Sequence, residues 1–370
     1  MSDRARRQLL LCIIATLLSL GCVAVYSATA VQAAHYYGNS LWFVLRHLMA
    51  MGIGVGAAMV CLAIPMPRWR AWSKGLAVAG LVLITVVSMV GPEIGGAQRW
   101  FRIGRLSIQP SEFAKLALVL YVADFLARKR GTMHDFRRGF LPPLLLTGLM
   151  AGLVLLQPDL GTAIVMGSVV MLLFVVAHAR WRHVGLTMVC GAVALVVLIA
   201  GAEYRRRRLL AFLHPWEDPL GAGFQIVQSY LALGHGGWLG QGLGASMQKL
   251  YYLPGGHTDF MFAIIGEELG VAGTSAVIAL YALFVGCGMR MALAVQEHFH
   301  KYLICGCVGL IGLEAMVHMA VVTGLLPTKG LPLPLVSYGG TSLVGNLIAC
   351  ALILNASRGS RADGGMRITE

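Results

Sequence analysis

The amino-acid sequence predicts an all-α polytopic membrane protein, because of its composition and its long apolar runs. Of its 370 residues 58% are hydrophobic and 12% are charged, and the mean hydropathy is +0.75. This composition leaves too little polar surface to cover a soluble globule of such length. About ten runs approach the roughly 20 apolar residues that a bilayer-crossing helix needs. They lie near residues 9–31, 44–64, 75–91, 111–127, 140–157, 160–178, 184–202, 260–286, 302–326 and 335–356.

The basic residues predict the orientation of these ten transmembrane helices. An even number of spans puts both termini on one side, and the Lys and Arg of the short connecting segments are concentrated on that side. Cytoplasmic loops carry such an excess, so we expect both termini to be cytoplasmic. The first run ends near Ala28-Thr29-Ala30, which resembles a signal-peptide cleavage site. The run is longer than the apolar core of such a signal, and we expect it to remain as a span.

The net charge of +13 and the eight cysteines set limits on function. Topology and attraction to anionic lipid surfaces explain the charge, and nothing in its pattern indicates nucleic-acid binding. The cysteines lie in or at the ends of apolar runs, where they behave as small hydrophobic residues. We therefore expect neither a disulfide framework nor a metal cluster. Residues 1–370 form one predicted membrane domain, with a long extracytoplasmic loop, 202–259, between the seventh and eighth helices.

The first polar outer segment, residues 92–109, places Arg99 and Trp100 among glycines and leads into Gln109-Pro110-Ser111-Glu112. Proline and glutamate suit the first turn of a helix, and this helix carries Lys115 inside the predicted span. Glu112 and Lys115 are three residues apart and can pair on one face. Two interpretations stay open: an ion pair that fixes helix packing, or a counter-charge for a ligand.

The long outer loop contains two further patterns. Arg205 to Arg208 precede alternating apolar residues, which predicts an amphipathic helix at the outer membrane interface. This basic cluster is either a solvated anchor or a binding site for a lipid diphosphate. Gln225, Gln228 and Ser229 then lie on a short predicted helix, and a glycine-dense turn follows that would let the backbone approach a ligand closely.

A third polar segment, residues 325–343, follows the ninth predicted span and carries Lys329 and Ser337 on the outer side. Non-helical backbone near membrane depth is tolerated only where protein buries it or where it lines a wet cavity. These outer segments together therefore predict a water-filled pocket that is open to the outer face.

Asp259 is the strongest catalytic candidate, because an ionisable residue at a membrane boundary is functional by default. It follows His257 and precedes an apolar run. At a helix start it would be a partly desolvated carboxylate, which suits a general base. Glu267 would lie about 12 Å away at ~1.5 Å per residue, too far to be the second acid of a retaining pair. A single base favours inverting displacement of a leaving group such as a diphosphate.

Five ordered blocks span essentially the whole chain: QPSEFAKL (109–116), LQPDLGT (156–162), PWEDPLGAGFQIVQS (215–229), KLYYLPGGHTDFMFAIIGEELG (249–270) and GLLPTKGLPLPLVSYGGTSL (324–343). These blocks resemble the signature blocks of the SEDS family, the shape, elongation, division and sporulation proteins of bacteria. Details at Trp216 to Pro219 and at Pro327 to Gly330 resemble the division branch more than the elongation branch.

The resemblance implies a peptidoglycan glycosyltransferase that polymerises lipid II at the outer face of the cytoplasmic membrane, at the division septum. The essential aspartate of the family maps onto Asp259, which would deprotonate the GlcNAc 4-hydroxyl that attacks the MurNAc anomeric carbon and expels undecaprenyl diphosphate. Implied partners are a class B penicillin-binding protein and other divisome proteins. The resemblance implies no firm cofactor, and a divalent cation, Mg²⁺ or Mn²⁺, is the candidate that would assist the diphosphate leaving group. The expected substrate-binding residues are Lys115, Glu112, Arg99, Gln109, Ser111, His257, Lys249, Gln228, Lys329 and Ser337.

The chain departs from the family pattern at three positions. Gly255 replaces a common glutamate that could have shared a cation with Asp259. Glu314 and His318 replace amides, and their spacing of four residues would let them pair with each other within the bundle. Two other function classes compete with the enzyme. The first is a lipid II flippase, because such a transporter would also have buried charges and a water-filled cavity, and the second is a non-catalytic division scaffold. The concentration of polar residues on the outer side favours the enzyme over the flippase. Within the enzyme class, an elongation-type polymerase remains the alternative to a division-type polymerase.

Overall fold

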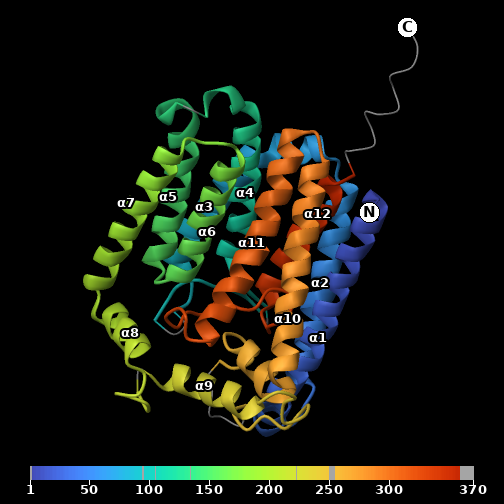
Figure 1. Cartoon of the computed structure of the whole chain (residues 1–370), viewed down its shortest axis with the longest axis vertical. Helices are drawn as coiled ribbons and strands as arrows, with labels where there is room; N and C mark the ends of the chain where they lie inside the picture. The colour runs from blue at the N-terminus through green and yellow to red at the C-terminus, as the bar shows by residue number, and fades with distance from the viewer. Residues whose placement is uncertain are drawn as a thin grey trace.

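The computed structural model describes residues 2–93, 96–104, 106–133, 135–221, 223–249 and 255–358. Long helices run roughly side by side along the long axis, and two short helices, α8 and α9, cross one end of the bundle (Figure 1). The long helices are α1 (Asp3–Tyr37), α2 (Trp42–Ala63), α3 (Met66–Val90), α4 (Pro110–Arg128), α5 (Leu141–Leu156), α6 (Leu160–Val176), α7 (Trp181–Ala200), α10 (Met261–Ala294), α11 (His298–Val322) and α12 (Gly340–Ala356). The short elements are β1 (Phe101–Ile103), β2 (Leu106–Ile108), η1 (Arg130–Thr132), η2 (Phe136–Phe140), α8 (Glu203–Leu213) and α9 (Phe224–Gly236).

Each apolar run lies largely within one of the long helices, which supports a helical polytopic membrane protein. Within the described residues, seven helices are long and apolar enough to cross a membrane, and α6 and α12 are shorter apolar helices. The 19 residues of α4 include four charged side chains, which lower its hydropathy. Helix α4 is therefore long enough to cross a membrane, and its charged residues are what keep it out of this set of seven apolar helices.

Three helix boundaries differ from the sequence prediction for physical reasons. Helix α1 begins at Asp3 rather than near residue 9, because the Ser2 side chain accepts a hydrogen bond from the backbone N–H of Ala5 and caps the helix. Helix α3 begins at Met66, since proline is tolerated in a first turn and the following basic side chains can reach the interface. Helix α12 begins at Gly340 rather than near 335, because Ser337 accepts a hydrogen bond from the Leu333 N–H in a tight turn.

Helices α4 and α11 form the centre of the bundle, and α7 lies at its edge. Most residues of α4 and α11 are buried, whereas Val184 is the buried residue of α7 among the residues that the structure describes. The apolar surface of α7 matches the lipid-facing side of a membrane helix. The core therefore sits between α4, α6, α10, α11 and α12, and α7 presents its apolar surface to the outside of the bundle.

Helix α10 is broken at Gly270, and a loop fills the break. Gly270 has φ 66°, and a Cβ there would lie 2.4 Å from the backbone nitrogen of Gly240. Backbone carbonyls of Gly237 and Trp238 accept hydrogen bonds from the two residues after the break, at 2.9 and 3.1 Å. Only glycine tolerates both this conformation and this approach. The segment that follows α9 in the sequence is thereby fixed to the part of α10 around Gly270.

A small antiparallel hairpin, which the all-α prediction did not include, connects α3 to α4. Its register pairs Phe101 with Ile108. The hydroxyl of Thr341 donates to the Ser107 carbonyl at 3.0 Å and accepts from the Gln109 N–H at 3.3 Å. The hairpin therefore ties the start of α4 to the start of α12, on the side where Asp259 lies.

Candidate functional site

A cavity of about 280 Å³ lies at the end of the bundle that carries α8. Six separate stretches of the chain contribute to it: the segment before β1, the turn before α6, the α7–α8 region, the start of α9, the turn at Asp259 and the turn at Lys329. The polar and charged side chains that line it are Arg99, Trp100, Asp159, Arg205, Arg208, Gln225, Asp259, Thr328 and Lys329. The predicted outer pocket therefore has a physical counterpart, built from residues far apart in sequence.

Asp259 stands in a turn that immediately precedes α10. The N–H of Asp259 donates to the Gly255 carbonyl at 2.8 Å, and the next residue, Phe260, is buried and anchors the turn. The helix begins at Met261, three residues later than expected near Thr258. Asp259 therefore still lies at the positive end of the helix dipole, although outside the helix.

Burial raises the pKa of Asp259 to about 6. A hydrogen bond from Thr258 and the positive charges of Arg208 and Arg99 oppose this rise, while the negative charge of Asp159 adds to it. At neutral pH most of the carboxylate is ionised, yet its basicity is much higher than that of an exposed aspartate. Such a group can accept a proton in a reaction near neutral pH.

The cavity carries more positive than negative charge. Arg99, Arg205, Arg208 and Lys329 face two carboxylates, Asp159 and Asp259. Cations converging in a partly buried space favour a ligand with several negative charges.

Two of the cavity cations have distinct environments. The Arg99 side chain donates to the backbone carbonyls of Gln157 at 2.5 Å and Pro158 at 2.8 Å, which fixes its guanidinium. Burial lowers the pKa of Lys329 to about 8, and the negative charge of Asp159 opposes that change. Arg99 is therefore a permanent, positioned cation, whereas Lys329 can lose its charge in mildly alkaline solution.

Sequence reasoning did not place Asp159, Trp100, Gln225 or Thr328 in the site. Asp159 caps α6: its carboxylate oxygens accept from the Thr162 N–H at 3.1 Å and from the Thr162 hydroxyl at 2.9 Å. The signal that could have found it is the LQPDLGT block, where an aspartate interrupts two apolar runs. Trp100 is next to Arg99 and Thr328 is next to Lys329 in the sequence, and this adjacency is the feature that could have indicated that they belong to the site.

Lys115 does not line the cavity. Its ammonium contacts Glu112 at 2.8 Å, as the spacing predicted, and also contacts Glu314 of α11. The expected pairing of Glu314 with His318 is wrong, because Lys115 occupies Glu314 and the His318 Nδ1 lies 2.7 Å from the Leu331 carbonyl oxygen. All three charged side chains of this Lys115 triad are buried. The contacts match the packing interpretation of the Glu112–Lys115 pair.

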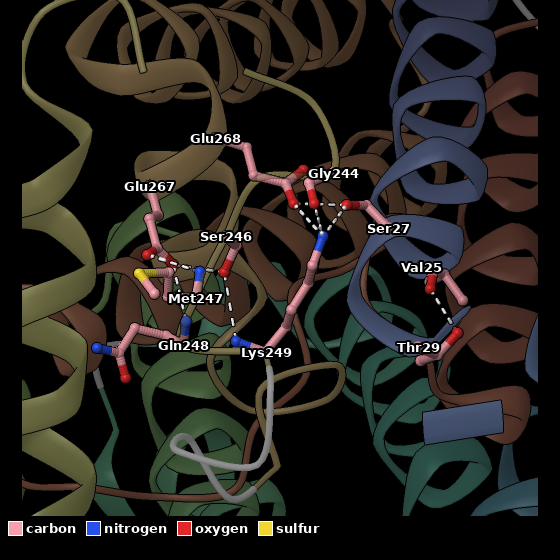
Figure 2. A network of polar contacts seen from close by, with 10 residues as sticks. All are labelled: Val25, Ser27, Thr29, Gly244, Ser246, Met247, Gln248, Lys249, Glu267 and Glu268. Atoms are coloured by element: carbon pink, nitrogen blue, oxygen red, sulfur yellow. Dashed lines mark hydrogen bonds and ion pairs between the residues drawn. The ribbon is translucent and has the colours of Figure 1, made fainter. Parts of the chain in front are cut away.

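Lys249 also lies outside the cavity, in a buried network that Figure 2 shows. Its ammonium donates to Glu268 at 3.0 Å, to the Ser27 hydroxyl at 3.2 Å and to the Gly244 carbonyl at 2.6 Å. Beside it, Glu267 accepts from the Ser246 hydroxyl and from two backbone N–H groups of the same loop (Figure 2). The network fastens the loop before Asp259 to α1 and α10.

The other predicted substrate contacts also lie outside the cavity lining. The Gln109 amide donates to the Ser111 hydroxyl at 3.1 Å beside the start of α4, and Ser337 holds the turn before α12. Gln228 is half-buried on α9. His257 packs its ring 5.4 Å from that of Phe43, and burial lowers its pKa. Of the predicted site residues, the structure thus brings Asp259, Arg99 and Lys329 together.

The cavity side chains do not form a resident metal site. No group of three or more His, Cys, Asp or Glu that could hold an ion occurs among the residues that the structure describes. Of the two cavity carboxylates, Asp159 accepts hydrogen bonds from Thr162 and Asp259 accepts one from Thr258, so both are already partly engaged within the protein. Protein cages for divalent cations use more ligands than this.

Comparisons with known proteins place this chain in a family. The family model described as cell cycle protein, for FtsW, RodA and SpoVE, matches residues 7–362. The probable peptidoglycan glycosyltransferase FtsW of Geobacter metallireducens is 42% identical over 339 residues, which cover 91% of this chain and 90% of that protein. Stage V sporulation protein E of Bacillus subtilis is 41% identical over 355 residues, which cover 95% and 97%.

Solved structures agree with the sequence comparisons. A chain of a peptidoglycan synthase complex that coordinates polymerization and crosslinking superimposes with a TM-score of 0.79 at 33% identity, covering 96% of this chain and 98% of that chain. The rod shape determining protein RodA of Thermus thermophilus gives a TM-score of 0.72 at 29% identity, covering 96% and 97%. The chain therefore belongs to the FtsW, RodA and SpoVE family of cell cycle proteins, which is the SEDS family that its five blocks resemble.

Proposed function

We propose that this protein is a peptidoglycan glycosyltransferase that polymerises lipid II during septal cell-wall synthesis. One observation carries the proposal: a carboxylate of raised pKa, Asp259, shares a cavity with four cations. A base beside a polycationic surface suits the attack of a sugar hydroxyl on a sugar diphosphate. The names of the relatives support the reaction class, and the several FtsW proteins among them support the division branch.

The proposed reaction assigns one role to each group of side chains. Asp259 accepts the proton of the acceptor GlcNAc 4-hydroxyl while that oxygen bonds to the donor MurNAc anomeric carbon. The bond from this carbon to the diphosphate oxygen breaks, and its electron pair leaves with undecaprenyl diphosphate. Arg99, Arg205, Arg208 and Lys329 stabilise the negative charge that develops on the leaving group. With a single base, the anomeric configuration inverts.

We propose the following membrane arrangement. The ten long helices span the cytoplasmic membrane with both termini in the cytoplasm, and residues 202–259 lie outside with the cavity. This places Asp259 on the side where lipid-linked precursors are polymerised. A class B penicillin-binding protein and other divisome proteins are the proposed partners, and the chain works as one membrane domain at the septum. The synthase complex among the structural relatives supports the transpeptidase partner.

A divalent cation is proposed only as a companion of the substrate. Mg²⁺ is commonly held by one or two carboxylates together with substrate phosphates. In this cavity Asp159 is engaged by Thr162 and Asp259 by Thr258, so an ion would arrive with the diphosphate and supply further charge neutralisation. Because four cations already line the cavity, we expect polymerisation to persist at reduced rate after chelation.

The decisive experiment compares the parent protein with Asp259→Asn in detergent, using labelled lipid II with and without the partner transpeptidase. The amide keeps the volume of the side chain but cannot accept the proton, so glycan polymers should disappear while lipid II binding remains. Glu217→Gln is the matched control, because Glu217 is exposed on the outer loop and lies outside the cavity lining. Near-normal polymer yield from Asp259→Asn would overturn the assignment of the base.

A further inference from the structure

A second cavity, of about 390 Å³, lies at the opposite end of the bundle from the active site. Three arginines, three leucines and one glutamine line it: Arg4, Arg7, Gln8 and Leu11 from α1, Leu62 from the end of α2, Leu354 from the end of α12, and Arg358 just beyond α12. Figure 1 shows the N-terminus of α1 beside the ends of α2 and α12 at this end of the molecule. We call this cavity the arginine cleft.

The guanidinium groups of the arginine cleft lack ion-pair partners among the residues that the structure describes. Other arginines at the same end are paired: Arg6 with Asp3 at 3.3 Å, and Arg128 with Asp124 at 2.9 Å. Asp3 also borders a small recess beside Arg7, but it makes its ion pair with Arg6. Unpaired cations that converge on one cavity repel each other, so a bound anion would stabilise the arrangement.

The helix dipole adds to this preference for an anion. Arg4 and Arg7 lie in the first two turns of α1, the positive end of that helix. Cations are disfavoured there and anions are favoured. The positive-inside rule explains why basic residues occur on this side, but a diffuse topology signal does not require three of them to share a cavity.

The floor of the cleft is apolar. Leu11 is 50% exposed, whereas Leu354 is 8% exposed and packs in the core. From this floor α1, α2 and α12 continue into the predicted membrane spans. A soluble anion would leave the leucine surface wet, whereas a phospholipid would cover it with acyl chains while its phosphate meets the arginines.

We propose that the arginine cleft binds an anionic phospholipid of the inner leaflet, with phosphate between the three guanidinium groups and acyl chains along Leu11 and Leu62. Three cations favour a headgroup with two phosphates, of the cardiolipin type, over one with a single phosphate. The site depends on the proposed cytoplasmic position of the termini but not on the proposed reaction. Its test is therefore lipid binding, which an error in the catalytic assignment would leave unchanged.

The test titrates delipidated full-length protein in detergent with cardiolipin, phosphatidylglycerol and phosphatidylethanolamine, and counts bound lipids by native mass spectrometry. The parent should prefer cardiolipin to phosphatidylethanolamine by about tenfold or more. Replacing Arg4, Arg7 and Arg358 with glutamine should weaken cardiolipin binding by about tenfold. The charge-matched control replaces three exposed arginines elsewhere at this end, Arg137 of η2 and Arg180 and Arg182 at the start of α7, and should bind as the parent does.

Two further arms make every outcome informative. Replacing the three cleft arginines with lysine keeps the charge and should retain affinity within about threefold, which separates loss of a binding site from loss of folding. Excess glycerol phosphate should not displace the lipid, because it lacks the chains that cover the leucine floor. Displacement by glycerol phosphate, equal loss in the charge-matched control, or unchanged affinity of the glutamine variant would each overturn the proposal.

Discussion

The backbone of Gly330 lies directly against the carboxylate of Asp259. A Cβ placed on Gly330 would stand 3.0 Å from Oδ2 and 3.5 Å from Cγ of that side chain. The segment between α11 and α12 thus limits where the proposed base can sit, and it also contributes the neighbouring Lys329 to the cavity. The absence of a side chain at position 330 lets the base and the cation share one small space.

Gly330→Ala should lower the turnover number without unfolding the protein. The added methyl group would displace the Asp259 carboxylate by a few tenths of an ångström, and we expect a loss of about tenfold because displacements near 1 Å can cost about a hundredfold. Steady-state polymerisation and a thermal unfolding curve measure the two effects. Gly339→Ala, in the same segment but with only ordinary contacts of 3.6 Å and more, is the control. Equal losses in both variants would contradict this account.

The pH dependence of kcat/KM should be bell-shaped, with limbs near 6 and near 8. Asp259 must be ionised to accept a proton, so activity rises as the pH passes its pKa of about 6. Lys329 must be protonated to meet the diphosphate, so activity falls as the pH passes its pKa of about 8. Lys329→Arg keeps a positive charge at all accessible pH values and should abolish only the alkaline limb. An alkaline limb that persists in this variant would exclude Lys329 as its origin.

Lys115→Met should destabilise the fold by about 3–5 kcal/mol, because it leaves Glu112 and Glu314 buried without their cation. Combining it with Glu112→Gln and Glu314→Gln removes the unpaired charges and should restore both the thermal midpoint in detergent and polymerisation. Lys74→Met, at an exposed position of α3, is the control for loss of a lysine. If the triple variant folds normally but stays inactive, Lys115 acts in the reaction rather than in packing.

Arg205 and Arg208 should contribute more to substrate affinity than Arg206 and Arg207. The first two line the cavity, whereas Arg206 is exposed and Arg207 pairs with Glu203 at 2.6 Å on the surface of α8. Converting the first pair to glutamine should weaken lipid II affinity by about tenfold and flatten its dependence on salt. Converting Arg206 and Arg207 to glutamine removes the same charge and should change lipid II affinity little. Equal effects of the two double variants, measured by lipid II titration at low and high salt, would indicate only a diffuse anchor.

The helices could be predicted from sequence because each apolar run of sufficient length has little choice but to form a helix in lipid. The α12 boundary could not, since the turn that delays it depends on a hydrogen bond from the Leu333 N–H to the Ser337 hydroxyl. The hairpin of β1 and β2 was also missed. Its strands are three residues long, too short for a periodic pattern to be recognised.

The candidate site was predicted only in part, because spacing along a chain reports local neighbours. The spacing predicted the Glu112–Lys115 pair, whose members are three residues apart. It could not predict the contact of Lys115 with Glu314, which is 199 residues away. Lys249 was assigned to substrate for the same reason. Its partners Ser27 and Glu268 are 222 and 19 residues distant, so the lysine appeared uncommitted in the sequence.

The cavity of the candidate site draws on residues from Ala97 to Gly330, so most of the polypeptide must be made before the cavity exists. The segment that contributes Lys329 follows α11, and it comes to rest on Asp259 through Gly330. During biosynthesis an incompletely translated chain would already hold its base but not this part of the enclosure. The fold thereby makes activity depend on translation beyond α11, and a truncated product that ends before Lys329 should be unable to build cell wall.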